Sequence, residues 1–339
     1  MQKKQLRLLI ARQDRIGDVV LSTPIAREIK SSQPDSFIAV LVRDEIKDIY
    51  LNNPYVDEVI VLNEEKTWTG FWAMVKGLRK YHFTHAFILL PQERLNWILF
   101  FSMIPNRIGV GHKLYQFLSF TKYVDRKKYV EEKHEADYCM DMVRKIGFTP
   151  KSIEPEIYLT SREHEGIKNF RNNIASGRII IGINSSSGGS APNLPKSEYR
   201  KLIELIICNE KFAVVITDNI IPIELRDLDN VIYPSATTTV RGLINVIASL
   251  DLLISASTGP MHIASALKIP TLSFFCPLPA CSPKLWGPLG NKSEIILPEE
   301  IYCKTQCPKD PKKCDYSKVG GLRAEDILAR IKTFLNSIK

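Results

Sequence analysis

The chain has 339 residues, of which 45% are hydrophobic and 24% are charged. This length suits two domains of common size, and the composition excludes a disordered or fibrous protein. The 46 Lys and Arg residues outnumber the 37 Asp and Glu residues, so the formal net charge is +9. An anionic partner is therefore favoured, but charge alone does not choose among a nucleic acid, a phosphorylated sugar and a membrane surface.

The sequence predicts a cytosolic protein. The N-terminal apolar stretch is short and lacks a small-residue cleavage site, which disfavours a secretory signal. The longest apolar segment, Asn96–Pro105, is far below the roughly 20 residues that a membrane-spanning helix needs. The odd number of cysteines, seven, fits a reducing compartment better than a disulfide framework.

Short apolar runs alternate with longer amphipathic stretches along the chain. In the first half, the runs that predict buried strands are residues 6–12, 37–43, 56–62 and 85–90, with helices expected at 22–31 and 67–80. The second half repeats this pattern, with strands expected at 178–184, 212–217, 250–257 and 271–277 and helices at 197–209, 239–250 and 259–267. The alternation predicts two doubly wound α/β domains.

The charged stretch 149–171 has little periodicity and predicts the domain boundary. We therefore expect an N-terminal domain over residues 1–160 and a C-terminal domain over 161–322. Residues 323–339 form a closing amphipathic helix, which we expect to pack back on the N-terminal domain. A ligand cleft between the domains is expected at the carboxyl ends of the strands.

The loop after the first predicted strand carries Arg12, Asp14 and Arg15 close to Asp18. These are more polar groups than a turn or a helix cap requires. Asp18 lies at or just before the first turn of the next helix, where the helix dipole favours an ionised carboxylate. A simple N-cap is the alternative role for Asp18.

Two further loops have the composition of phosphate sites. In SASTGPMHIASAL, residues 255–267, Pro260 is suited to the first position of a helix whose free N–H groups bind an anion such as a diphosphate. His262 is a candidate to assist a leaving phosphate, with a packing histidine as the alternative. In INSSSGGSAPN, residues 183–193, hydroxyls and glycines let backbone N–H groups approach a phosphate. Neither a Walker loop nor a dinucleotide G-x-G-x-x-G motif occurs, which disfavours kinase and dehydrogenase functions.

Taken in order, the motifs RIGDVVLSTPIAREIK, NNPYVDEVIVL, NRIGVGHK, HEADYCMDMVRKIG, INSSSGGSAPNLP and STGPMHIASALKIPTLSFFCP resemble glycosyltransferase family nine, the ADP-heptose:lipopolysaccharide heptosyltransferases. The resemblance runs from about Leu6 to the terminal helix. It implies a GT-B fold, in which two Rossmann-like domains face a central cleft. It also implies an inverting, metal-independent transfer of heptose from ADP-heptose to the inner core of lipopolysaccharide, at the cytoplasmic face of the inner membrane.

The resemblance also implies roles for individual residues. Asp18 matches the proposed general base, and Arg107 matches a basic position facing the acceptor, which Arg15 would join. The residues expected to bind the donor diphosphate are Ser185, Ser186, Ser187, Gly188, Ser257, Thr258, Gly259, Pro260, Met261 and His262. Candidate ribose ligands are Asp218 and Glu224. No cofactor, metal or nucleic acid is implied; the partners are a nucleotide-sugar, an anionic glycolipid acceptor and the membrane surface.

Two positions depart from the family pattern. Ser257 stands where many members carry Asp before Thr-Gly-Pro, and Pro192 stands where they carry Lys or Arg ahead of Trp-Pro. Lys196, four residues further on, is a possible substitute for that cation. The departures keep open another nucleotide-sugar enzyme of the same fold, either a hexosyltransferase or an epimerase, and a degenerate sugar-nucleotide-binding module.

The remaining clusters favour structural roles. Cys303, Cys307 and Cys314 lack the paired C-x2-C spacing of a structural zinc site, so we expect free loop thiols, with a metal knuckle as the alternative. The aromatic stripe in residues 67–81 has helical spacing and predicts core packing rather than a membrane anchor. Burial is also expected for RLNWILFF, residues 94–101, with lipid contact as the alternative.

Overall fold

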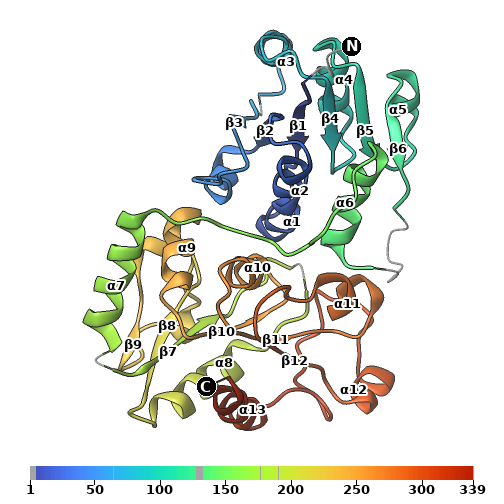
Figure 1. Ribbon diagram of the computed structural model, residues 1–339. Helices are drawn as coiled ribbons and strands as arrows, with labels where there is room; N and C mark the ends of the chain where they lie inside the picture. Colours follow the sequence, from blue (N-terminus) through green and yellow to red (C-terminus); the bar gives the residue numbers. More distant parts are fainter. Residues whose placement is uncertain (1–4, 64, 127–132, 176, 190, 339) are drawn as a thin grey trace. The chain divides into compact units, whose positions relative to one another are not determined.

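A computed structural model describes residues 5–63, 65–126, 133–175, 177–189 and 191–338 (Figure 1). The chain divides into two compact units. Unit 1 consists of Met1–Lys128 with Glu135–Tyr158, and unit 2 consists of Tyr129–His134 with Leu159–Lys339. The main change of unit, between Tyr158 and Leu159, falls inside the stretch 149–171.

The described part of unit 1 contains a six-stranded parallel sheet in the order β3-β2-β1-β4-β5-β6. Its strands are β1 (Arg7–Ala11), β2 (Phe37–Val42), β3 (Glu58–Val61), β4 (His85–Ile88), β5 (Asn106–Val110) and β6 (Lys122–Val124). The sequence predicted the first four strands, which are short apolar runs. It missed β5 and β6, because β5 begins with Asn-Arg and β6 is a short edge strand with exposed side chains.

Helices cover the unit 1 sheet. They are α1 (Ile16–Ser22), α2 (Pro24–Ser32), α3 (Trp68–Arg79), α4 (Glu93–Phe101), α5 (Leu114–Leu118) and α6 (Glu135–Lys145), with a 3-10 helix η1 (Asp44–Ile49). Side chains of α3 and α4 pack on the sheet face that carries Leu9 and Ala11. The helix expected at 22–31 corresponds to α2, which begins at Pro24, a residue without an N–H group. A separate helix, α1, precedes it and starts at Ile16.

The described part of unit 2 repeats the same topology. Its six-stranded sheet has the order β12-β11-β10-β7-β8-β9. The strands are β7 (Ile179–Asn184), β8 (Phe212–Ile216), β9 (Val231–Ile232), β10 (Leu252–Ala256), β11 (Thr271–Phe274) and β12 (Ser293–Ile296). Counted from the first strand of each unit, both sheets have the order 3-2-1-4-5-6 of the Rossmann fold, in which ligands bind beyond the carboxyl ends of the strands.

The helices of unit 2 are α7 (Ser161–Ala175), α8 (Lys196–Ile207), α9 (Val240–Ala248), α10 (Gly259–Ala266), α11 (Pro283–Trp286), α12 (Glu300–Thr305) and α13 (Ala324–Ser337). Short 3-10 helices are η2 (Ile223–Leu225), η3 (Ser235–Thr238) and η4 (Pro279–Cys281). The predicted helices at 197–209, 239–250 and 259–267 correspond to α8, α9 and α10, with ends that differ by at most two residues.

The closing helix α13 belongs to unit 2, so the expectation that it packs back on the N-terminal domain is wrong. Its apolar residues Ile327, Ile331 and Phe334 lie in the core cluster that also contains residues of β7, β8 and α8. The Glu198 carboxylate of α8 accepts a hydrogen bond of 3.0 Å from the Ala324 N–H at the start of α13. The apolar stripe of α13 is therefore buried by the nearest sheet and helix of its own unit.

Among the described residues, no helix combines the length and the apolar character required to cross a membrane.

Replacing Ile331 with Ala tests the place of α13. Ile331 is fully buried, so the truncation should lower the free energy of unfolding by about 3 kcal/mol, the usual cost of such a cavity. Lys332→Ala, one residue along and exposed, should change it by less than about 0.5 kcal/mol. Urea unfolding curves of the two variants measure the difference, and equal effects would contradict the packing of α13.

Candidate active site

The loop after β1 leads directly into α1. Arg15 occupies the N-cap position of α1, and its side chain makes no capping hydrogen bond. Asp18 lies in the first turn of the helix. The N-cap role for Asp18 is therefore wrong, because the helix begins at Ile16.

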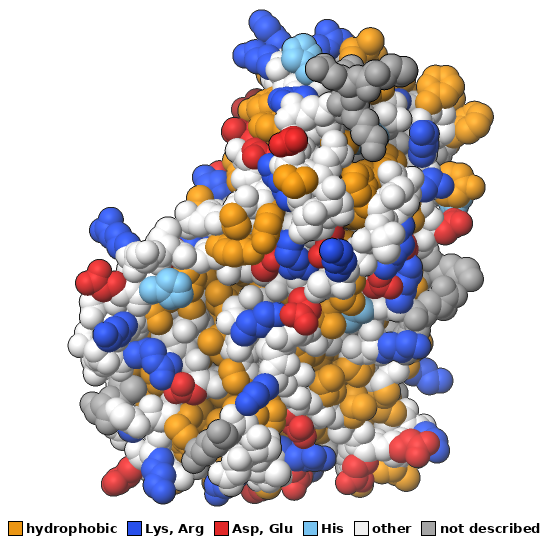
Figure 2. Space-filling view, in the orientation of Figure 1, with side chains coloured by type: hydrophobic (Ala, Val, Ile, Leu, Met, Phe, Trp, Pro, Cys, Tyr) orange, Lys and Arg blue, Asp and Glu red, His pale blue; other side chains and the backbone are white. Residues whose placement is uncertain are grey.

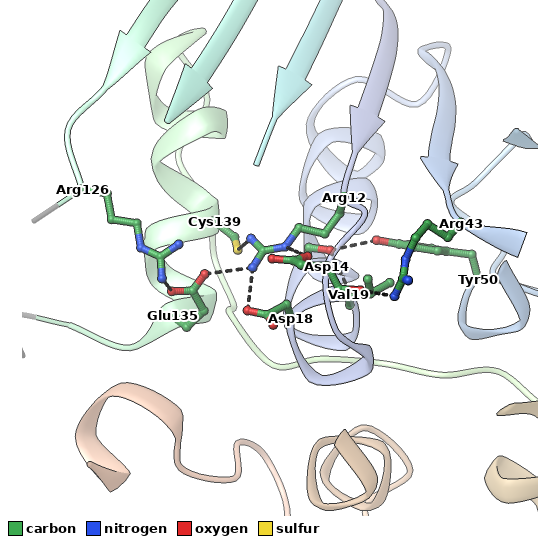
Figure 3. A network of polar contacts seen from close by, with 10 residues as sticks. Arg12, Asp14, Asp18, Val19, Arg43, Tyr50, Arg126, Glu135 and Cys139 are labelled. Carbon is green, nitrogen blue, oxygen red and sulfur yellow. Dashed lines mark hydrogen bonds and ion pairs between the residues drawn. The ribbon is translucent and has the colours of Figure 1, made fainter. Parts of the chain in front are cut away.

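The Asp18 carboxylate belongs to a network centred on Arg12, which is only 2% exposed (Figure 3). The Arg12 guanidinium donates to Asp14 Oδ1 at 2.6 Å, to Asp18 Oδ1 at 2.7 Å and to Glu135 Oε1 at 3.3 Å. Arg126 pairs with the other oxygen of Glu135. Among the described residues, Asp18 Oδ2 has no hydrogen-bond partner, so one oxygen is held while the other is available to a substrate.

The network is buried unevenly, and this sets its electrostatics. Burial raises the pKa of the Asp14 and Glu135 carboxyls, while the Arg12 charge opposes the rise. Burial alone would lower the pKa of Arg12, but the surrounding carboxylates hold it above its ordinary value. Burial also raises the pKa of the Cys139 thiol, a further Arg12 contact, to about 12. Arg12 therefore stays charged and fixes the position of Asp18.

The two predicted acceptor residues occupy different environments. Arg15 is exposed at the start of α1. Arg107 is buried in β5, and its guanidinium donates to the carbonyl groups of Ile104 and Ser119. These two bonds hold two turns of unit 1 together, while the buried Arg107 Nε has no hydrogen-bond partner among the described residues. The acceptor-facing role of Arg107 stays a prediction.

Sequence reasoning missed a pocket in unit 1. The pocket has a volume of about 260 Å³ and its lining includes Gln13, Arg43, Lys66, Gln92 and Arg94. Gln13 follows β1, Arg43 follows β2, and Lys66 lies in the segment after β3, so the pocket lies at the carboxyl edge of the sheet. Among the described residues, the buried Gln13 Nε2 and Arg43 Nε atoms have no hydrogen-bond partner. The pocket therefore offers positive charge to an anion.

The pocket was hard to see in the sequence, because its cations come from separate segments that are not motifs. Arg43 lies at the end of a strand, and Lys66 and Arg94 lie near the starts of helices. These positions, at the carboxyl edge of a parallel sheet, were the only indication of the pocket in the sequence.

In unit 2, the loop after β7 is held by the buried carboxylate of Asp218. Asp218 Oδ2 accepts hydrogen bonds of 2.9 Å from both the N–H and the hydroxyl of Ser185. Asp218 is 2% exposed, and these bonds order the loop; the ribose-binding role stays a prediction. Glu224, the other ribose candidate, is an exposed residue of η2.

The next residues of this loop, from Ser186 to Gly189, are mostly exposed. Ser186 and Gly188 are exposed, and the Ser187 hydroxyl donates to the Ala191 carbonyl at 3.0 Å. Gly188 and Gly189 have φ of 55° and 71°, a conformation that favours glycine. These positions leave the backbone uncovered by side chains, as close approach of a phosphate requires.

Lys196 reaches back to this loop from the start of α8. Its ammonium group donates to the Ser185 carbonyl and lies 3.5 Å from the Ser185 hydroxyl. Burial lowers the pKa of Lys196, and the Asp218 charge opposes the shift. Lys196 therefore places an ammonium group beside the loop that follows β7.

The second predicted phosphate loop lies after β10. Thr258 is the N-cap of α10, Gly259 and Pro260 begin the helix, and Met261 is buried. The Thr258 side chain accepts no capping hydrogen bond from the helix N–H groups; its hydroxyl donates to Asn184 Oδ1 at 3.5 Å. Ser257, which is 9% exposed, precedes this turn. The α10 N–H groups therefore lie at the carboxyl edge of the sheet, beside the loop that follows β7.

His262, in the first turn of α10, is buried and neutral. Burial, with a smaller effect of His134, lowers its pKa from 6.5 to about 3. Its Nδ1 atom has no hydrogen-bond partner among the described residues. His262 is therefore neutral near neutral pH. Its ring can donate or accept a hydrogen bond to a ligand, but it cannot supply a positive charge.

The cysteines expected in a loop lie in and around α12. Cys303 belongs to α12, and the buried Cys314 lies 3.3 Å from the Tyr302 hydroxyl. Within the described part of the chain, no group of three or more His, Cys, Asp or Glu side chains is arranged to hold a metal ion.

Residues 71–316 match the family described as Glycosyltransferase family 9 (heptosyltransferase). This match spans more than half of the chain, so the chain belongs to that family and is a glycosyltransferase, as its motifs predicted.

The chain is also similar to individual proteins of Haemophilus influenzae. It shares 26% identity over 307 residues with one named "Putative glycosyltransferase", covering 86% of this chain and 88% of that protein. It shares 25% identity over 316 residues, with the same coverage of each chain, with Lipooligosaccharide heptosyltransferase 2.

Solved structures share the fold. A glycosyl transferase family 9 protein of Veillonella parvula matches with a TM-score of 0.80 at 18% identity, covering 99% of each chain. The ADP-heptose lps heptosyltransferase II of E. coli matches with a TM-score of 0.74 at 17% identity, covering 98% of this chain and 99% of that one. The predicted α/β class and GT-B architecture, with two Rossmann-like units, are confirmed.

The neutrality of His262 predicts a specific acid sensitivity. The unfolded chain binds a proton at this histidine below about pH 6.5, whereas the folded chain does so only near pH 3, so stability is lost as pH falls through this window. Between pH 7 and pH 5, the wild type should lose about 2 kcal/mol more unfolding free energy than His262→Gln. Urea unfolding at each pH measures this, with the exposed His164→Gln as control. Parallel losses in wild type and His262→Gln would contradict a buried neutral ring.

Proposed function

We propose that this glycosyltransferase moves heptose from ADP-heptose to the inner core of lipopolysaccharide, with inversion and without a metal ion, and with Asp18 as general base. The observation that carries the proposal is the ion pair between the buried Arg12 and Asp18 Oδ1, which leaves Oδ2 available. The heptosyltransferase names of its family and of the relatives support the choice of heptose as the transferred sugar.

The proposed reaction begins with proton transfer to Asp18. An acceptor hydroxyl hydrogen-bonded to Oδ2 gives its proton to the carboxylate as its oxygen attacks the anomeric carbon. Arg12 holds the carboxylate in one orientation and stays charged throughout, so Asp18 accepts the proton with little reorganisation. The new carbon–oxygen bond forms on the face opposite the leaving ADP, and this gives inversion.

The bond to ADP breaks in the same step, and negative charge builds on the diphosphate. The groups proposed to meet that charge are the N–H groups at the start of α10, the Lys196 ammonium and the hydroxyls of Ser185 and Thr258. A neutral His262 adds a hydrogen bond at most, because its pKa is too low for it to supply a positive charge.

The proposed acceptor is an anionic glycolipid, and the proposed location is the cytoplasm, at the inner face of the inner membrane. The net charge of +9 and the unit 1 pocket that contains Arg43, Lys66 and Arg94 support an acceptor bearing carboxylates or phosphates. A hexose donor is the alternative, since Ser257 replaces the usual family Asp at the donor loop. Comparing ADP-heptose with ADP- and UDP-hexoses by thermal shift decides between them, because the true donor stabilises the fold.

Asp18→Asn tests the base. The amide keeps the shape but cannot accept the proton, so turnover should fall about 100-fold or more, while ADP affinity stays close to wild type and thermal stability falls no further than in Asp14→Asn. Asp14→Asn is the matched control, because it also removes one carboxylate from Arg12. Turnover measured with ADP-heptose and the core acceptor should be much less affected by Asp14→Asn. If the two effects are reversed, Asp18 is not the base.

Two experiments test how the charge on the departing ADP is stabilised. Activity should survive excess EDTA, since protein groups rather than a metal ion stabilise that charge. Lys196→Met should lower turnover about ten-fold or more, because it removes the cation beside Ser185. Lys201→Met, an exposed lysine of the same helix, should not. Loss of activity in EDTA with recovery on adding Mg²⁺ or Mn²⁺ would refute this part of the proposal.

A further inference from the structure

Unit 1 exposes large apolar side chains over α3, the end of α4 and α5. We define the aromatic face as Trp68, Trp72, Met103, Leu114, Phe117 and Phe120. Trp68 and Phe120 are each 79% exposed and Phe117 is 78% exposed. Figure 2 shows apolar side chains standing out at the upper right of the molecule, where Figure 1 places α5. The sequence had predicted core packing for the stripe in 67–81, and for both tryptophans this is wrong.

The aromatic face is continuous with packed rings beneath it. The ring of Phe71, which is buried, lies 6.1 Å from that of Trp68 and 5.3 Å from that of Trp72, between centroids. Trp72 in turn lies 5.4 Å from Phe101 at the end of α4. Residues of α3 and α4 thus form one apolar surface, since exposed rings rest on rings that belong to the core.

Buried polar groups hold the other half of the surface in place. Arg107 bridges the carbonyl groups of Ile104 and Ser119, which are the neighbours of Met103 and Phe120. Asn96 of α4 bonds to the Ser119 hydroxyl. The turn after α4 and the turn after α5 are therefore tied together from below, and their apolar side chains are left outside.

The backbone at both turns is unfavourable for the residues it carries. Met103 has φ of 62° and Phe120 has φ of 54°, in the left-handed region where glycine or asparagine is much easier to accommodate. Burial does not offset this unfavourable conformation, because both side chains are mostly exposed. Both residues follow the C-cap of a helix, a position where glycine or asparagine is usual, and here each presents an apolar side chain to water.

Positive charge surrounds the aromatic face. Residues 65–125 contain eight Lys and Arg residues against three Asp and Glu residues, and one of the eight, Arg107, is buried. Exposed Lys66, Lys113 and Lys122 lie within two residues of Trp68, Leu114 and Phe120 respectively. Exposed tryptophan and phenylalanine beside lysine is the composition that partitions into the interface of an anionic bilayer.

We propose that the aromatic face docks unit 1 on an anionic lipid bilayer, with its apolar side chains in the interface and the lysines against the headgroups. The proposal rests on the proposed function in that a membrane glycolipid acceptor gives docking its purpose. It adds the surface itself, which lies on helices and turns outside the Arg12 network. It meets the unit 1 pocket only at Lys66 and at Arg94, which donates to the Glu65 and Thr67 carbonyl groups.

The test compares binding of the full chain to vesicles with and without anionic lipid. Wild type should sediment with phosphatidylethanolamine–phosphatidylglycerol vesicles, less at high salt, and poorly with phosphatidylcholine vesicles. The double variant Met103→Asn with Phe120→Asn should bind at least ten-fold more weakly. Asparagine tolerates positive φ, so the thermal midpoint of this variant should equal or exceed that of wild type. The thermal midpoint therefore separates a loss of binding caused by the missing apolar side chains from one caused by misfolding.

Two controls separate docking from general hydrophobicity and from the reaction. Val319→Asn with Ile301→Asn removes exposed apolar side chains from unit 2 and should leave vesicle binding unchanged. Transfer to a delipidated, soluble core acceptor should be the same in wild type and in Met103→Asn with Phe120→Asn. If wild type does not use that acceptor, the proposed function is wrong. The vesicle experiment still tests docking in that case, because it measures lipid binding and not transfer.

Three results would overturn the docking proposal. They are the absence of wild-type binding to anionic vesicles, equal binding by the Met103→Asn, Phe120→Asn variant, and a wild-type oligomer in sedimentation velocity that the same variant dissociates. The last would assign the aromatic face to contact between copies of this chain.

Discussion

The buried guanidinium of Arg12 is the constraint on which the catalytic side of unit 1 depends. It stands at the end of β1 and is bonded to Asp14 in the same loop, to Asp18 in α1 and to Glu135 in α6. A buried charge that loses its partners is strongly destabilising, so these elements must stay together for unit 1 to stay folded. The carboxylate proposed as the base is thus fixed by the same interaction that joins α1 and α6 to the sheet.

Unit 2 orders its corresponding edge in a similar way, with the charges exchanged. There the buried group is the carboxylate of Asp218, after β8, and it binds the backbone and hydroxyl of Ser185 after β7. Lys196 adds a cation to the same loop. Because the two sheets share one strand order, each places its buried charge beside the first strand, where ligands of Rossmann-like folds bind.

Unit 1 also reverses the usual distribution of polar and apolar groups at α5. Arg107 and Asn96 are buried there and donate to backbone and side-chain oxygens, whereas Met103, Phe117 and Phe120 are exposed. Hydrogen bonds to the buried polar groups stabilise this part of unit 1. Burying the exposed apolar side chains would stabilise it further. An apolar surface that the fold keeps outside is consistent with a partner that covers it.

The sequence by itself determined the fold class, the family, eight of the strands and the loops that carry Asp18 and Thr258, because buried parallel strands are continuous apolar runs and the loops after them are short motifs. It could not show that Asp218 bonds to Ser185 and Arg107 to the Ser119 carbonyl, that Lys196 reaches the loop after β7, or that Arg43 and Arg94 line one pocket. Nor could it show that Trp68 and Trp72 are exposed, since helical spacing does not say which face is covered. These properties depend on contacts between segments far apart in the chain, and only the tertiary structure decides which charges are buried and which partners they meet.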